Sequence, residues 1–166
     1  MATPTQPLRE EHAELLPHIE LLRTVADSVG ETPLETLQHD VDRVHNLLVH
    51  SLIPHARAED EALYPVIGKL LGSTEATATM SRDHLEIVRL THELLAVRQQ
   101  IAGVTINDAQ TKALRRILYG LYALIKVHFA KEEDIYLPLL DKRLTPEEAH
   151  SIFQAMGEIA REARVT

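Results

Sequence analysis

The feature that most constrains the fold of this chain is an internal repeat of histidines and carboxylates. Residues 55–65 and 128–138 both read H-x-x-x-E-[DE]-[DE]-x-x-x-P, with an offset of 73 residues. Residues 11–16 and 83–88 both read [DE]-H-x-E followed by two aliphatic residues, with an offset of 72. The paired motifs predict two copies of one helical hairpin, each with a histidine on its first helix and an H-x-x-x-E on its second.

Apolar residues recur at helical spacing in four long segments, which predict four amphipathic helices. Their expected ranges are about 5–29, 33–71, 74–101 and 107–140. Gly30, Gly72 and Gly103 follow the first three ranges, as is typical of helix ends. Pro54 and Pro65 interrupt the second range, so this helix is expected to bend or to resume as a second piece.

A shorter fifth helix is expected over about 146–163, because Thr145, Pro146 and Glu148 have the spacing of a capping box with proline at the first helical position. No segment alternates with a period of two, so no strand is expected. The prediction is an all-α protein, a single domain over residues 1–166. An antiparallel up-down-up-down four-helix bundle spans about 8–140, and the C-terminal helix follows.

Composition excludes several classes of function. The net charge of −8 disfavours binding to nucleic acid or to anionic lipid, since both require clustered cations. The absence of cysteine excludes disulfides, thiolate metal sites and cysteine nucleophiles. The first residues, MATPTQP, do not resemble a signal peptide, and no apolar run approaches the roughly 18 residues of a membrane span, so a soluble cytoplasmic protein is expected.

The repeat separates six polar residues from the rest of the chain, which contains ten histidines. Four-residue spacing puts His55 above Glu59, and His128 above Glu132, on helix faces that also carry apolar residues. In the last of these helices the face carries Leu121, Leu124 and Ile135. The histidines of the first and third helices are likewise in line with aliphatic residues. The residues expected to face the core are His12, His55, Glu59, His84, His128 and Glu132.

Buried imidazoles and carboxylates are costly unless they are paired or bind metal. Six nitrogen and oxygen ligands are too many for one tetrahedral zinc ion and suit a pair of octahedral first-row metals, of which iron is the usual occupant. Each residue alone is more simply explained as an ordinary core or surface residue, but packing gives no reason for both hairpins to keep the same polar set. The sequence therefore predicts a dinuclear site in the bundle core.

The remaining polar residues near the motifs are expected to have lesser roles. The acids that follow Glu59 and Glu132 should face solvent or accept hydrogen bonds from imidazole N–H groups. Tyr64 and Tyr136 are expected to pack at helix ends, and Tyr136, one turn beyond Glu132, is the better candidate for a donor near the site. The histidines expected at the solvated surface or at helix boundaries are His18, His39, His45, His50, His92 and His150.

On these motifs, the sequence resembles the hemerythrin-like (HHE cation-binding) family over about residues 8–140. The resemblance implies two iron ions with a bridging oxo or hydroxo group. It implies that Glu59 and Glu132 bridge the irons. The implied ligands are His12, His55, Glu59, His84, His128 and Glu132. The Glu-x-x-His motif of ferritin-like proteins does not match here.

The sequence departs from oxygen-carrying hemerythrins in two respects. Met80 and Val88 stand where those proteins have a further histidine one turn from the position of His84, and the last carboxylate, Glu132, is at H-x-x-x-E spacing where those proteins have a longer H-x-x-x-x-D. An iron that lacks one imidazole has an additional open position, which favours reaction or sensing over reversible carriage. The hypothesis is a di-iron protein that binds or reacts with O2, H2O2 or NO, with catalase-like or peroxidase-like turnover as one form of it. The alternative is a metal-dependent structural or sensing module without turnover; a zinc hydrolase is less favoured because no H-E-x-x-H occurs.

Overall fold

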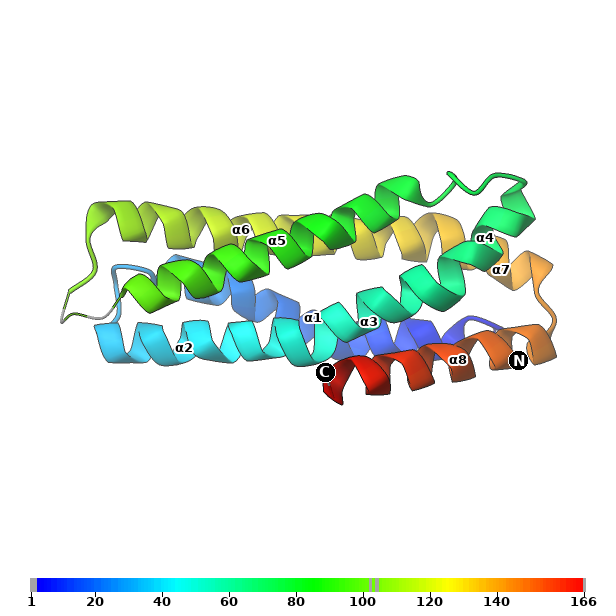
Figure 1. Cartoon of the computed structure of the whole chain (residues 1–166), viewed down its shortest axis with the longest axis horizontal. Helices are drawn as coiled ribbons and strands as arrows, with labels where there is room; N and C mark the ends of the chain where they lie inside the picture. The colour runs from blue at the N-terminus through cyan, green and yellow to red at the C-terminus, as the bar shows by residue number, and fades with distance from the viewer. Residues whose placement is uncertain (1–2, 102, 104, 166) are drawn as a thin grey trace.

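The computed structural model describes residues 3–101, 103 and 105–165, and within these ranges the chain is helical and contains no strand. Figure 1 shows long helices lying side by side, among them α1 (Gln6–Ser28), α5 (Ala78–Gln100) and α6 (Asp108–Lys131). Both α1 and α5 pack against α6 and also against α2 (Leu34–Leu47). The prediction of an all-α protein is confirmed.

Two of the four predicted long helices consist of consecutive segments that join without a break. The second runs through α2, η1 (Leu48–Leu52), α3 (Ile53–Ala58), η2 (Glu59–Leu63) and α4 (Tyr64–Leu71). The fourth runs through α6, η3 (Glu132–Tyr136) and α7 (Leu137–Arg143). The three η segments are turns of π-helix, in which the hydrogen bond spans five residues instead of four.

Each π turn ends two residues before a proline. The three prolines are Pro54, Pro65 and Pro138. In η2 the Tyr64 N–H donates to the Glu59 carbonyl, and in η3 the Leu137 N–H donates to the Glu132 carbonyl. A proline has no N–H and clashes with the carbonyl four residues before it. The wider turn accommodates this mismatch, so the helix continues through the prolines. Figure 1 shows that the second long helix changes direction between α2 and α4, as expected for a helix interrupted by Pro54 and Pro65.

The prediction that Ile135 faces the core is wrong, because its side chain is 59% exposed. Ile135 lies inside η3, where the extra residue in the turn changes the direction of the side chains that follow Glu132. Leu137 and Leu140, just beyond the π turn, are fully buried.

The helix ends use the signals expected from the sequence. The Thr145 hydroxyl accepts from the Glu148 N–H, and the Glu148 carboxylate accepts from the Thr145 N–H, so the predicted capping box begins α8 (Pro146–Val165). Asn107 and Gln110 form a second capping box at the start of α6. Gly30 and Gly72 have φ angles of 85° and 69°, the left-handed conformation that favours glycine after a helix. The C-terminal helix α8 packs against α3 and η2.

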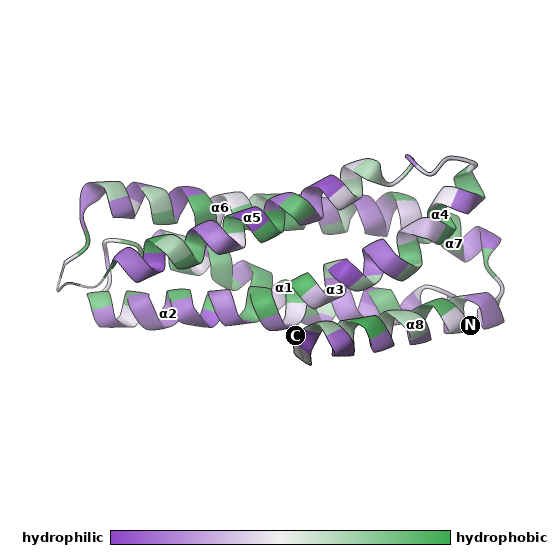
Figure 2. Ribbon diagram, in the orientation of Figure 1, coloured by the Kyte–Doolittle hydropathy of each residue, from purple (hydrophilic) through white to green (hydrophobic). Residues whose placement is uncertain are grey.

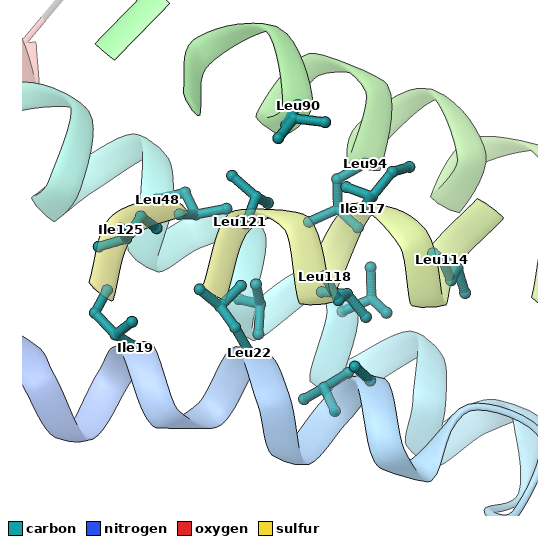
Figure 3. Close-up of a cluster of buried hydrophobic side chains, with 14 of the residues drawn as sticks. Ile19, Leu22, Leu48, Leu90, Leu94, Leu114, Ile117, Leu118, Leu121 and Ile125 are labelled. Carbon is teal, nitrogen blue, oxygen red and sulfur yellow. The ribbon is translucent and has the colours of Figure 1, made fainter. Parts of the chain in front are cut away.

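Figure 2 shows that each long helix carries both hydrophobic and hydrophilic residues. The buried hydrophobic side chains form two apolar clusters. The large cluster gathers side chains of α1, α2, η1, α5 and α6, including Leu22, Leu118 and Leu121 (Figure 3). The small cluster lies where α4, α7 and α8 meet the start of α1 and includes Leu8 and Met80. None of the helices in the described ranges combines the length and hydropathy needed to cross a bilayer.

Truncation of a side chain in the large cluster should destabilise the fold. Leu118 is fully buried, so Leu118→Ala should lower the free energy of unfolding by about 2–5 kcal/mol. Leu85 is 61% exposed, and the matched Leu85→Ala change should cost less than about 0.5 kcal/mol. Denaturant unfolding followed by circular dichroism measures both; equal losses would contradict this account of the core.

Candidate metal centre

The six polar residues expected in the core lie between the two apolar clusters. On α1, His12 follows Leu8 of the small cluster and precedes Leu15 of the large one, and on α5 His84 likewise lies between Met80 and Ile87. His55 and Glu59 come from α3 and η2, and His128 and Glu132 from α6 and η3. All six side chains are buried, with exposed fractions of 4% or less. The structure thus brings the predicted residues together; their role as metal ligands stays a prediction.

The centre divides into two groups of potential ligands that share Glu59. One group consists of His12, His55 and Glu59, and the other of Glu59, His84 and His128. Within each group the ligand atoms lie within 4.8 Å of one another, close enough to hold a metal ion. Both histidines of the first group come from the first hairpin, and both histidines of the second from the second hairpin.

The two carboxylates each direct one oxygen toward each group. Glu59 Oε1 lies 3.0 Å from His55 Nε2, and Glu59 Oε2 lies 3.3 Å from His84 Nε2. Glu132 Oε2 lies 3.4 Å from His12 Nε2, and Glu132 Oε1 lies 3.6 Å from His128 Nε2. This arrangement suits carboxylates that bridge two cations.

Each of the four rings also has a second carboxylate beside its outer nitrogen, Nδ1. The distances are 2.8 Å for Glu133 to His12, 3.0 Å for Glu11 to His55, 2.9 Å for Asp60 to His84 and 3.1 Å for Asp83 to His128. An ionised carboxylate only accepts hydrogen bonds, so the contacts at His12, His84 and His128 assign a proton to Nδ1 and direct Nε2 into the centre. The Glu11 carboxylate lies beside His55 Nδ1 without forming a hydrogen bond of good geometry.

The interior of the centre is therefore rich in acceptors and poor in donors. His84 Nε2 and His128 Nε2 lie only 2.9 Å apart, a distance that requires a proton on one of the two nitrogens or a cation beside both. His12 Nε2, His55 Nε2 and both oxygens of Glu59 are buried without a hydrogen-bond partner in the part of the chain described here. Buried polar atoms of this kind require a partner. The donor set of imidazole nitrogens and carboxylate oxygens therefore fits divalent or trivalent first-row metal ions.

Electrostatic interactions at the centre shift the pKa values of its carboxyl groups in opposite directions. Burial opposes ionisation of Glu59, but the charge of His55 and the contact with His12 outweigh it and hold the pKa of Glu59 well below its usual value. Burial and the nearby charge of Glu59 raise the pKa of Glu132 well above its usual value. Without a cation, the centre therefore resists the ionisation of both carboxyl groups together.

The histidine rings respond to the same carboxylates. Burial lowers the pKa of His84, but hydrogen bonds with Asp60 and Glu59 outweigh this effect and raise it to about 9. Burial likewise opposes protonation of His55, and the charges of Glu59 and Glu11 raise its pKa well above the usual value. The carboxylates around the rings thus favour positive charge inside the centre.

The predicted roles of the two tyrosines are reversed in the structure. The Tyr64 hydroxyl donates to Glu132 Oε1 at 2.7 Å and lies 3.3 Å from His128 Nε2, so it lies beside the second ligand group. Burial, followed by the charges of Glu59 and Glu132, raises the pKa of its phenol. The Tyr136 hydroxyl donates instead to the backbone carbonyl of Ala76. In the repeat with an offset of 73 residues, the position equivalent to Tyr64 is occupied by Leu137 and not by Tyr136.

The acids next to the core residues either contact a histidine ring or face solvent, according to their position in the repeat. Asp60 and Glu133 accept from imidazole nitrogens, as expected for the acids that follow the two core glutamates, whereas Glu61 and Asp134 are exposed. Sequence reasoning missed Glu11 and Asp83, although both copies carry an acid directly before the first-helix histidine. Of the six histidines outside the centre, His45 is half-buried and the others are exposed.

Comparison with known proteins places the chain in a family. Searches of curated proteins and of solved structures found no significant match. Residues 3–140 match the family model described as the hemerythrin HHE cation binding domain, so α8 lies beyond the matched region. The match covers most of the chain and contains every residue of the buried His/Glu cluster, which fits metal binding. The chain therefore belongs to the hemerythrin HHE cation-binding domain family.

Proposed function

We propose that this chain is a non-haem di-iron protein whose buried centre binds or reacts with O2, peroxide or NO. The observation that carries the proposal is the direction of the two core carboxylates. Each of Glu59 and Glu132 presents one oxygen to each pair of histidines, so two cation positions share both glutamates.

In this proposal the first cation position is held by His12 and His55, and the second by His84 and His128. Two iron ions joined by an oxo or hydroxo group are the proposed occupants, because imidazole together with bridging carboxylate is a ligand set that suits iron. The helices that carry these residues form an antiparallel up-down-up-down bundle. The order of colours along the rods in Figure 1 and the packing of α1 and α5 against both α2 and α6 support this arrangement.

When bound, a pair of irons supplies a Lewis acid and a source of electrons for small oxidants. The chain contributes the surroundings for that chemistry. The outer carboxylates fix the orientation of the rings, and the two apolar clusters limit the access of water. Tyr64 holds a proton at Glu132 Oε1, beside the second position. Met80 is fully buried in the small cluster and offers no imidazole, so each group that could hold a metal contains two imidazoles.

Metal analysis tests the composition of the centre. Protein purified from iron-supplied cells should contain about two irons per chain, because two ligand groups share the bridging carboxylates. Glu59→Ala should lower the iron content of both positions, since both groups include Glu59, whereas Glu61→Ala removes an exposed acid of the same turn and should leave it unchanged. An iron content near zero in the unaltered protein would refute the proposal.

The Tyr64 hydroxyl should affect the second position more than the first. Tyr64→Phe keeps the buried ring but leaves Glu132 Oε1 without its donor, so iron affinity at the second position should fall by roughly 10–100-fold. The matched variant Tyr136→Phe, whose hydroxyl binds a backbone carbonyl away from the centre, should retain the affinity. Anaerobic Fe²⁺ titration measures both, and equal affinities in the two variants would count against a role for Tyr64.

Exposure of the reduced protein to oxidants separates turnover from a purely structural role for the metal. Anaerobically reduced protein should develop a charge-transfer absorption band on addition of O2 or H2O2, and NO should change its spectrum. Peroxide consumption would indicate catalase-like or peroxidase-like turnover, whereas a stable reversible adduct with O2 would indicate carriage. Iron-dependent thermal stability without any reaction would support the alternative, a metal-dependent structural or sensing module.

A further inference from the structure

Three of the four carboxylates beside the outer ring nitrogens are themselves held by further side chains. Arg9 pairs with the Glu133 carboxylate that contacts His12. Lys131 pairs with the Asp83 carboxylate that contacts His128. These two cations are only about a third exposed, with side-chain exposures of 27% and 31%.

Within the part of the chain that the structure describes, the other two carboxylates, of Asp60 and Glu11, contact no such cation. The Ser81 hydroxyl donates to Asp60 Oδ1 at 2.5 Å, and Asp60 Oδ2 contacts His84. Glu11, which contacts His55, has a side chain that is 42% exposed. The centre therefore has two rings whose carboxylate is held by a cation and two whose carboxylate is not.

The repeat shows that this difference is a divergence between the two copies. Arg9 and Ser81 occupy equivalent positions, three residues before His12 and His84. Lys131 occupies the position equivalent to Ala58, directly before the core glutamate. The cation thus acts on the first-helix histidine in one copy and on the second-helix histidine in the other.

We propose that Arg9 and Lys131 are positioning residues, one for each cation position of the centre. Arg9 fixes Glu133 and through it the ring of His12; Lys131 fixes Asp83 and through it the ring of His128. This inference rests on the proposed di-iron function, because it concerns the ligands of the two positions. A carboxylate that accepts from a cation and from a ring at once has little freedom to rotate, so the ring keeps its orientation.

A cation also changes what the carboxylate does to the ring. Part of the carboxylate's charge interacts with the guanidinium or ammonium group, so the Nδ1 proton is held less strongly than by a free carboxylate. Asp60, which accepts from the neutral Ser81 hydroxyl, has no cation competing for its charge in this way. The first position therefore combines His12, whose carboxylate pairs with Arg9, and His55, whose carboxylate contacts no cation in the described residues. The second combines His128, whose carboxylate pairs with Lys131, and His84, whose carboxylate accepts from Ser81. The two positions thus differ in the cation that holds the outer carboxylate.

A structural role for Arg9 must be distinguished from this one. Arg9 also lies 3.2 Å from Asp141 of α7, and Asp141 accepts from the Thr5 N–H and hydroxyl at the start of α1. Asp141→Asn weakens this attachment without altering Glu133. It is therefore the control for a contribution of Arg9 to stability alone.

The experiment is an anaerobic titration of the metal-free protein with Fe²⁺, for the unaltered chain, Arg9→Gln, Lys131→Gln and the double variant. Each single variant should weaken one of the two equivalents by roughly 10–100-fold, and the double variant should weaken both. Arg9→Lys should restore the affinity. Asp141→Asn and Arg57→Gln, which removes an exposed ion pair with Glu61, should stay within about threefold of the unaltered chain.

Histidine-selective ¹⁵N NMR of Zn²⁺-loaded protein provides a second readout that does not depend on affinity. Arg9→Gln should shift the Nδ1 resonance of His12, and Lys131→Gln that of His128, with little effect on the other ring. Unchanged resonances, or an Arg9→Gln variant that behaves like Asp141→Asn, would overturn the inference. If the unaltered chain takes up no iron, the proposed function fails, and the same resonances in metal-free protein still decide whether Arg9 and Lys131 position the rings.

Discussion

The middle of a bundle that otherwise buries mainly leucine, isoleucine and valine contains two carboxylates and the inner nitrogens of four imidazoles. Such a set of acceptors cannot satisfy itself, because almost every member needs a donor or a cation. The surrounding structure follows from this need. The apolar core is divided into two clusters on either side of the centre, and an outer carboxylate lies beside the outer nitrogen of each ring.

Much of this arrangement can be predicted from the sequence because the repeat makes it visible. Helical spacing correctly brings His55 over Glu59 and His128 over Glu132, and the six predicted residues lie together in the core. The positions of the outer acids are also present in both copies, beside the histidine in the first helix and beside the glutamate in the second. Charge and composition alone would have identified none of them.

The predictions that fail lie at or just beyond the π turns. In an α-helix, a residue five positions after a glutamate faces away from it, whereas the five-residue hydrogen bond of a π turn brings it back to the same side. Tyr64, five residues after Glu59, therefore reaches the centre, and Ile135 turns toward solvent. No spacing rule of the ordinary helix indicates this change. A proline two residues after each π turn is what the three turns share, but Pro17 lies inside α1 without such a turn, so proline alone does not indicate one.

The two hairpins exchange carboxylates across the centre. Each hairpin provides both histidines of one ligand group, yet Glu132 of the second hairpin reaches His12 of the first, and Glu59 of the first reaches His84 of the second. Asp60 and Glu133 cross between hairpins in the same way. Neither half of the chain can therefore bring both core carboxylates to its histidines before the other half has docked. A cation that is bound by both core carboxylates therefore requires that the two halves have assembled. It joins two segments that are far apart in the sequence, much as a disulfide does in a chain with cysteines.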